Sequence, residues 1–109
     1  MHVIGIRKTL VEQEPWLGAS LMKAFEAAKR IVYTDLREVA ALKTTLPWVT
    51  QEYEETVALM GADYWPYGIE ANRPTLDAFL QYHHEQGLSP TPAKLEDVFL
   101  ASAMETVKV

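Results

Sequence analysis

The sequence contains no cysteine among its 109 residues. This absence excludes disulfides, thiolate nucleophiles and cysteine-based zinc or iron–sulfur sites. Long apolar runs are missing as well. None approaches the roughly 20 residues of a transmembrane helix, and the apolar stretch at the N-terminus is shorter than the core of a signal peptide. We therefore expect a cytoplasmic protein that does not insert into a membrane.

Basic residues are few and scattered along the chain. Ten Lys and Arg residues stand against fifteen Asp and Glu residues, which gives a net charge of −5. Because binding to nucleic acid needs clustered positive charge, we expect no nucleic-acid partner. The hydrophobic fraction of 49% is ample for a small core, so residues 1–109 are predicted to form a single domain. In a chain of this length burial only modestly outweighs conformational entropy, so we expect any uncovered apolar face to be covered by another subunit, in a homo-oligomer, or by missing sequence.

The clearest periodic segment is a helix that opens at Glu14 and Pro15, since proline is well tolerated at the first helical position. Its apolar residues recur at spacings of three and four: Leu17, Leu21, Phe25, Ala28 and Val32. The opposite, solvated face is predicted to hold four charged residues: Lys23, Glu26, Lys29 and Arg30. The helical pattern continues as far as Lys43, after a kink near Thr34.

Further helices are predicted by shorter signals. Thr9 and Glu12 have the spacing of a capping box, and Gly61 and Gly87 are typical of residues that end helices. These signals favour helices over residues 10–13, 47–60, 74–86 and 94–100.

Two segments have strand character. Val3 to Ile6 is a short β-branched run, and residues 106–109 form a weaker one. A single strand cannot satisfy its own hydrogen bonds, so the two ends pair with each other or the first strand pairs with something outside this sequence. The predicted fold class is mostly α, an α+β fragment with four to five helices and one or two short strands.

The least generic segment, residues 63–69, has three aromatic residues, a proline and a glycine. Arg73 follows it at a predicted helix start, where a positive charge opposes the helix dipole unless an anion or an acidic residue is nearby. One interpretation is a carboxylate site, in which Arg73, Asn72 and backbone N–H groups clamp the anion. An aromatic ring of the ligand would then stack on Tyr64, Trp65 or Tyr67. The predicted partner is then a small aromatic or anionic ligand.

The alternative interpretation of the same segment is structural. Arg73 would pair with Glu70 or Asp77, and the aromatic residues would close a hydrophobic corner. Aromatic residues in Pro/Gly turns are more often structural than ligand-binding, so the sequence leaves both interpretations open.

No other group of residues predicts a site. His83 and His84 are adjacent, and neighbours on a helix point about 100° apart, so they cannot chelate one ion as residues at i and i+4 do. Glu52, Glu54 and Glu55 show no sign of the burial that would raise a carboxyl pKa for general acid catalysis. We predict no metal and no cofactor, and a solvated face for the three glutamates.

Residues 65–73, Trp-Pro-Tyr-Gly-Ile-Glu-Ala-Asn-Arg, resemble the Trp-Pro-Tyr-Gly-(Leu/Ile)-Glu-x-Asn-Arg stretch of the 4,5-dihydroxyphthalate decarboxylase family. Other segments resemble that family in the same order: His2 to Arg7, Pro15-Trp16 with residues 23–29, Leu46-Pro47-Trp48 and Glu85-Gln86-Gly87-Leu88. The resemblance implies the two-lobed type 2 periplasmic-binding-protein fold. This chain would be the C-terminal helical part of a protein about three times longer, and its first strand would join a sheet formed upstream.

The resemblance also implies a carboxy-lyase of phthalate degradation, which removes one carboxylate from 4,5-dihydroxyphthalate without oxidation and yields protocatechuate. It assigns no catalytic residue here, although Arg73 would suit the carboxylate that stays, and the fragment alone is expected to be inactive. One alternative is the solute-binding lobe of an ABC-type transport receptor for an aromatic or small anionic ligand, which would be periplasmic. The other is a helical dimerising remnant without a ligand.

Overall fold

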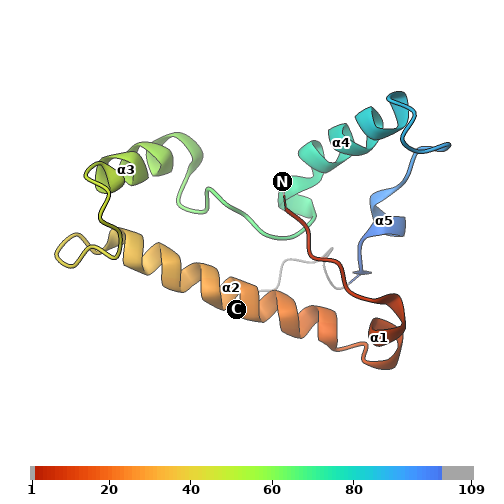
Figure 1. Cartoon of the computed structure of the whole chain (residues 1–109), viewed down its shortest axis with the longest axis horizontal. Coiled ribbons are helices and arrows are strands. Elements are labelled where there is room, and N and C mark those ends of the chain that lie inside the picture. Colours follow the sequence, from red (N-terminus) through yellow and green to blue (C-terminus); the bar gives the residue numbers. More distant parts are fainter. Residues whose placement is uncertain (1, 102–109) are drawn as a thin grey trace. The chain divides into compact units, whose positions relative to one another are not determined.

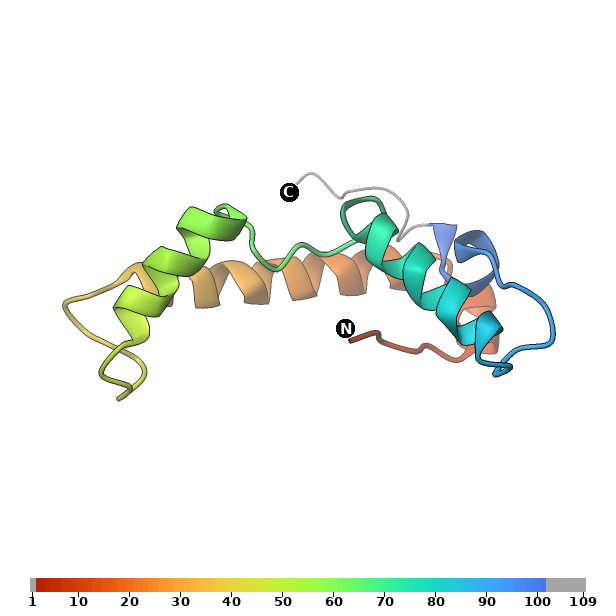
Figure 2. The same cartoon turned by 90° about the horizontal axis from the view of Figure 1, so that it is seen from above.

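The computed structural model describes residues 2–101. Its contacts divide the chain into two compact units. The terminal unit comprises the residues up to 23 and those from 68 onward, and the central unit comprises residues 24–67. Figures 1 and 2 show the helices of both units. Each unit is described by itself below, and the single-domain organisation stays a prediction.

The first helix, α1 (Lys8–Gln13), begins earlier than its capping-box signal indicates. Its N-cap residue is Arg7, which makes no side-chain capping bond. The predicted capping box of Thr9 and Glu12 is therefore wrong, because Thr9 already lies inside the helix.

The second helix, α2 (Leu17–Arg37), contains the predicted long amphipathic segment (Figure 1). It passes through Thr34 without ending, and the Thr34 hydroxyl donates a hydrogen bond of 2.9 Å to the carbonyl of Arg30 one turn earlier. The helix stops well before the predicted end at Lys43. Beyond it, the Glu38 side chain accepts a hydrogen bond from the backbone N–H of Ala40 (2.8 Å).

The third helix, α3 (Val49–Met60), confirms the helix predicted over residues 47–60, except for its first two residues. It ends at Gly61, whose φ of 90° is a conformation that glycine adopts at little cost. The Gly61 N–H donates to the carbonyl of Val57 at 2.9 Å. The terminating role predicted for Gly61 is therefore confirmed.

A short 3₁₀ helix, η1 (Glu70–Asn72), leads directly into α4 (Arg73–Glu85). Two hydrogen bonds close the end of α4: the N–H of Gly87 donates to the carbonyl of His84 (2.9 Å) and that of Leu88 to the carbonyl of His83 (3.0 Å). With a φ of 73° at Gly87, this is the Schellman arrangement. The glycine signal thus ends this helix as predicted.

The last described helix, α5 (Leu95–Val98), is shorter than the predicted 94–100. Its most buried side chain is that of Leu95, which packs with Ile69 and with Leu76 of α4 to form the core of the terminal unit. Leu80 and Phe99 border this core. The packing places α4 and α5 side by side in both ribbon views (Figures 1 and 2).

The mostly α fold class is confirmed, but the strand predicted at Val3 to Ile6 is wrong. Residues 2–101 contain no strand. Val3 and Ile4 lie in an irregular segment and are 68% and 62% exposed. A strand exists only when a neighbour satisfies its backbone groups, and the described residues supply none. The weaker strand predicted over 106–109 lies outside the described residues.

No helix in the described part of the chain is both long and apolar enough to cross a membrane.

Candidate functional site

Arg73 lies at the first position of α4 in the terminal unit, and acidic side chains surround it. Its Nη2 is 2.6 Å from Glu70 Oε1 and its Nε is 3.4 Å from Glu70 Oε2. Its Nη1 is 3.6 Å from Glu96 Oε1, an ion pair beyond hydrogen-bond length. The hydrogen bond between Arg73 and Glu70 lowers the pKa of the glutamate carboxyl and raises that of the guanidinium. These carboxylates offset the positive charge at the helix start.

Asn72 forms the turn that precedes Arg73. Its side-chain amide donates a hydrogen bond of 2.8 Å to the carbonyl of Gly68, which is in the same turn. It is the N-cap residue of α4 by position, yet its side chain makes no capping bond. Asn72 therefore holds the backbone that brings Arg73 to the start of α4.

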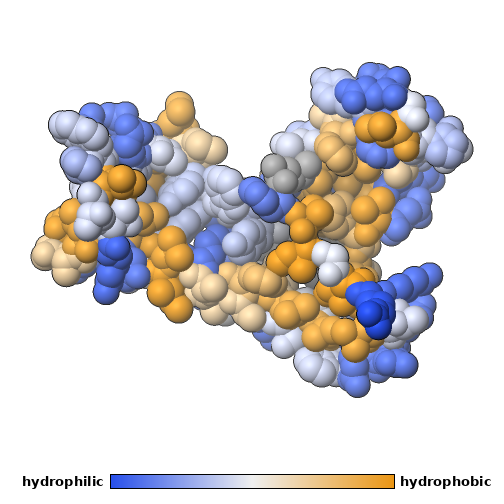
Figure 3. Space-filling view, viewed as in Figure 1, coloured by the Kyte–Doolittle hydropathy of each residue, from blue (hydrophilic) through white to orange (hydrophobic). Residues whose placement is uncertain are grey.

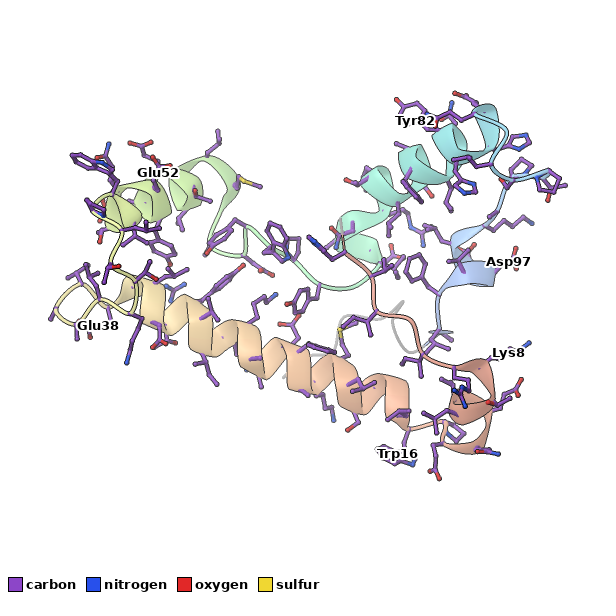
Figure 4. All side chains as sticks on the ribbon, in the orientation of Figure 1. Lys8, Trp16, Glu38, Glu52, Tyr82 and Asp97 are labelled. Atoms are coloured by element: carbon purple, nitrogen blue, oxygen red, sulfur yellow. The ribbon has the colours of Figure 1, made fainter. Side chains whose placement is uncertain are left out.

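A pocket of about 370 Å³ opens beside Arg73 in the terminal unit. Its walls come from α4, from the segment that leads into α5 and from the start of α5. In Figure 4 the label Tyr82 marks α4 and the label Asp97 marks α5. The lining side chains include the cations Arg73 and Lys94, the carboxylates Asp77, Glu85 and Glu96, and His84. The volume lies within the range of about 300–1,000 Å³ typical of small-molecule pockets. The lining thus combines two cations with three carboxylates.

Trp65 and Tyr67 lie in the central unit, so the four predicted site residues are divided between the two units. The Trp65 side chain is 55% exposed. Its backbone N–H donates to the hydroxyl of Tyr33 (3.0 Å), and its carbonyl accepts a hydrogen bond from Lys29 Nζ (3.3 Å). The Tyr67 ring lies 4.5 Å from the same Lys29 Nζ, a cation–π distance. Both aromatic residues are thus tied to α2.

Lys29 is the centre of a polar cluster that the sequence did not predict. Its side chain is only 8% exposed, and its Nζ lies 3.1 Å from Asp63 Oδ1 and 3.2 Å from Glu26 Oε2. We call Lys29, Glu26, Asp63, Tyr33 and Tyr67 the lysine cluster. Two carboxylates, a carbonyl and an aromatic ring compensate the buried ammonium group for the water it has lost. The assignment of Lys29 to a solvated face is therefore wrong.

Sequence spacing gave only a partial signal for this cluster. Glu26 and Tyr33 stand at i−3 and i+4 from Lys29, which places them next to it on the helix. Asp63 and the Trp65 carbonyl are 34 and 36 positions away. No local pattern predicts such contacts, so the burial of Lys29 depends on tertiary structure.

Tyrosine rings extend the cluster toward α3. The ring of Tyr33 stacks on that of Tyr64 at 4.9 Å, and the ring of Tyr53 meets Tyr64 edge-on at 6.1 Å. The Tyr53 hydroxyl accepts a hydrogen bond of 2.8 Å from Arg37 Nε. Burial raises the pKa of the Tyr33 hydroxyl to about 12, with a further contribution from Asp63, and burial also raises the pKa of Tyr64. The Tyr33 hydroxyl therefore remains protonated at neutral pH, where it donates to Asp63 and accepts from the N–H of Trp65.

The adjacent histidines of α4 each contact Ser89. His83 Nδ1 is 3.2 Å from the Ser89 hydroxyl, and His84 Nδ1 is 3.1 Å from the Ser89 carbonyl. Among residues 2–101 no three His, Asp or Glu side chains gather in a way that could hold a metal ion.

The fold and these contacts define a small, mostly helical chain with a charged pocket in one unit and a buried lysine in the other. No family model matches the sequence. All 109 residues nevertheless align, at 39% identity, with a 4,5-dihydroxyphthalate decarboxylase of Comamonas testosteroni. This match confirms the resemblance to the 4,5-dihydroxyphthalate decarboxylase family that residues 65–73 indicate. The chain spans 33% of the length of that relative.

Proposed function

We propose that this chain is part of a protein that decarboxylates 4,5-dihydroxyphthalate to protocatechuate. The observation that supports the proposal is the 39% identity, over the whole chain, with a relative of that name. In this reaction the bond between the ring and one carboxylate carbon breaks, carbon dioxide leaves, and a proton takes its place. The ring hydroxyl para to the leaving group supplies electron density, so that the carbon is protonated before carbon dioxide departs.

The groups that such a reaction requires are a proton donor, a base for the phenol and a cation for the carboxylate that stays. Arg73 is the proposed cation. It borders the pocket, and its side chain is 36% exposed. Because exposed ion pairs contribute little free energy, a substrate carboxylate can take the place of Glu96 beside Nη1. Asn72, which precedes Arg73 in the terminal unit, completes the proposed ligand-binding pair there.

The proposed proton donor and phenol base lie in polypeptide outside this chain, since the chain corresponds to one third of the relative. The 109-residue chain by itself is accordingly expected to be inactive. The reaction belongs to the longer assembly, to which this chain contributes the helices, the charged pocket and the aromatic turn (residues 63–69).

The test is a chimera of the Comamonas testosteroni relative in which this chain replaces the matching segment. Purified chimera is incubated with 4,5-dihydroxyphthalate, and both substrate loss and protocatechuate formation are followed by chromatography. The unaltered relative is the positive control, and the same relative with the matching segment deleted is the negative control. We expect protocatechuate from the chimera and none from the deletion. Tight binding without turnover would instead support a solute receptor.

A further inference from the structure

The central unit contains no buried hydrophobic residue. Among residues 24–67 a single residue is buried, and it is Lys29. The three buried hydrophobic residues of the described chain, Ile69, Leu76 and Leu95, all belong to the terminal unit. Burial of apolar surface is the main force that holds a domain together. The polar lysine cluster alone therefore does not account for a folded central unit.

Large apolar side chains of the central unit face outward instead. We define the central apolar surface by eight exposed residues: Ile31, Val32, Val39, Leu42, Leu46, Trp48, Leu59 and Met60. Leu59 is 87% exposed and Trp48 is 70% exposed. Figure 3 shows hydrophobic residues at the surface among polar ones around the C-terminal end of α2 and the segment that follows it. Large apolar side chains left in water on a unit without an apolar core favour an interaction site.

We infer that the central apolar surface docks onto polypeptide equivalent to the two thirds of the Comamonas testosteroni relative that this chain does not match. The relative's length supplies the argument, since 67% of it has no counterpart in the 109 residues. The inference rests on the proposed function in one respect, because it takes its partner from the same relative.

Charge argues against a second copy of this chain as the occupant. Residues 24–67 carry seven Asp and Glu residues and only four Lys and Arg residues. Two copies would carry the same net negative charge, and this like charge disfavours their association. The glutamates of α3, which Glu52 marks in Figure 4, are exposed and remain in water in the docked state.

The absence of cysteine makes a direct test possible, because a cysteine introduced into this chain is its only thiol. Leu59→Cys reports on the central apolar surface, and Glu54→Cys is the matched control on the same helix, outside that surface. Each variant is labelled with a maleimide in the 109-residue chain alone and in the chimera, and the labelled peptide is quantified by mass spectrometry. We expect the Leu59→Cys peptide to label at least ten-fold more slowly in the chimera, while the Glu54→Cys peptide labels at similar rates in both.

A second measurement uses separate polypeptides. The 109-residue chain is co-expressed with a tagged form of the relative's unmatched two thirds, and the captured complex is weighed by native mass spectrometry. A one-to-one complex that Leu59→Asp weakens at least ten-fold, and Glu54→Lys does not, supports the docking.

Two results would overturn the inference. One is equal labelling of Leu59→Cys with and without the rest of the relative. The other is protection of Leu59→Cys in the chain alone that grows with concentration, which would identify a second copy as the occupant. Neither readout depends on catalysis. An inactive chimera in which Leu59→Cys is protected supports the docking and contradicts the proposed reaction. An active chimera in which Leu59→Cys is unprotected supports the reaction and contradicts the docking.

Discussion

Lys29 and Asp63 lie 34 positions apart in the chain, yet Lys29 Nζ is 3.1 Å from Asp63 Oδ1 and 3.4 Å from Asp63 Oδ2. The contact joins α2 to the first residue of the aromatic turn. Tyr33, one turn further along α2, contacts the same carboxylate at 3.2 Å and the N–H of Trp65 at 3.0 Å. Two side chains of one helix therefore hold the first part of the turn, residues 63–65.

Replacing Lys29 with Met should loosen the aromatic turn. The variant leaves Glu26 and Asp63 close together without their cation, and we expect a loss of about 1–3 kcal/mol in the local free energy of opening. Asp63 is 57% exposed, which favours the lower end of that range because water screens its charge. Hydrogen exchange of residues 61–68 measures the effect. Lys23→Met, an exposed change on the same helix, is the control, and equal exchange in both variants would contradict the role of Lys29.

Tyr33 should make the central unit sensitive to alkali. Its pKa is raised in the folded state to about 12, against an ordinary value of 10.0. Between these values the unfolded chain loses the tyrosine proton while the folded chain keeps it. The stabilisation is therefore complete below pH 10 and declines as the pH rises toward about 12. Tyrosinate absorbance should show a component that titrates near pH 12 and disappears in Tyr33→Phe. The exposed Tyr82→Phe should retain it.

Leu95→Ala should destabilise the terminal unit. Leu95 is 2% exposed and packs against Ile69 and Leu76, so truncation leaves a cavity in a core that has three buried residues within the described part of the chain. We expect a cost of about 2–4 kcal/mol, seen as a lower urea midpoint by circular dichroism. Val98→Ala, in the same helix but 56% exposed, should change stability by less than about 0.5 kcal/mol. Similar midpoints for both variants would mean that this core does not stabilise the unit.

Gly87→Ala should weaken the end of α4. Gly87 has a φ of 73°, which an alanine adopts only at a cost of about 1 kcal/mol. Gly5→Ala is the control, because an added Cβ meets no atom within 4 Å at either glycine and only Gly87 of the two has a positive φ. Amide exchange over the last turn of α4 should rise in Gly87→Ala and stay unchanged in Gly5→Ala. Unchanged amide exchange in Gly87→Ala would show that another contact ends the helix.

Arg73→Gln tests the carboxylate site. If Arg73 binds the substrate, the chimera carrying this change should bind 4,5-dihydroxyphthalate at least ten-fold more weakly, because a hydrogen bond to a charged group contributes about 1.5–3 kcal/mol. Calorimetric titration measures the Kd, and Arg37→Gln in the central unit is the matched control. Unchanged affinity together with reduced stability would assign Arg73 a purely structural role, as the partner of Glu70.

The loss of folding stability at low pH gives an independent measure of the ion pair between Arg73 and Glu70. Arg73 lowers the pKa of Glu70 in the folded chain, so the contribution of the pair is present above the ordinary glutamate pKa of 4.5 and is lost as the pH falls through the lowered value. In Arg73→Gln the carboxyl of Glu70 should titrate at its ordinary value in a carbon-detected NMR titration.

The sequence by itself determined the helices and their glycine ends. The backbone hydrogen bonds of α2, α3 and α4 connect residues a few positions apart, so local spacing and local conformational preference suffice to predict them. The same locality explains why Gly61 and Gly87 were recognised as helix ends, and why the motif at residues 65–73 was enough to indicate the family.

Only the tertiary structure decided the rest. Val3 to Ile6 has strand propensity but forms no strand, because a strand depends on hydrogen bonds to a neighbour. The sequence predicts that Arg73 pairs with Glu70 or Asp77, both within about one turn of it. Its ion pair with Glu96 and the pocket beside it require α5 to pack on α4. Lys29 belongs by helical spacing to a solvated face, and its burial follows from Asp63 and Tyr67. Contacts between residues distant in sequence produce no local periodicity, so the sequence pattern does not predict them and the tertiary structure is needed to find them.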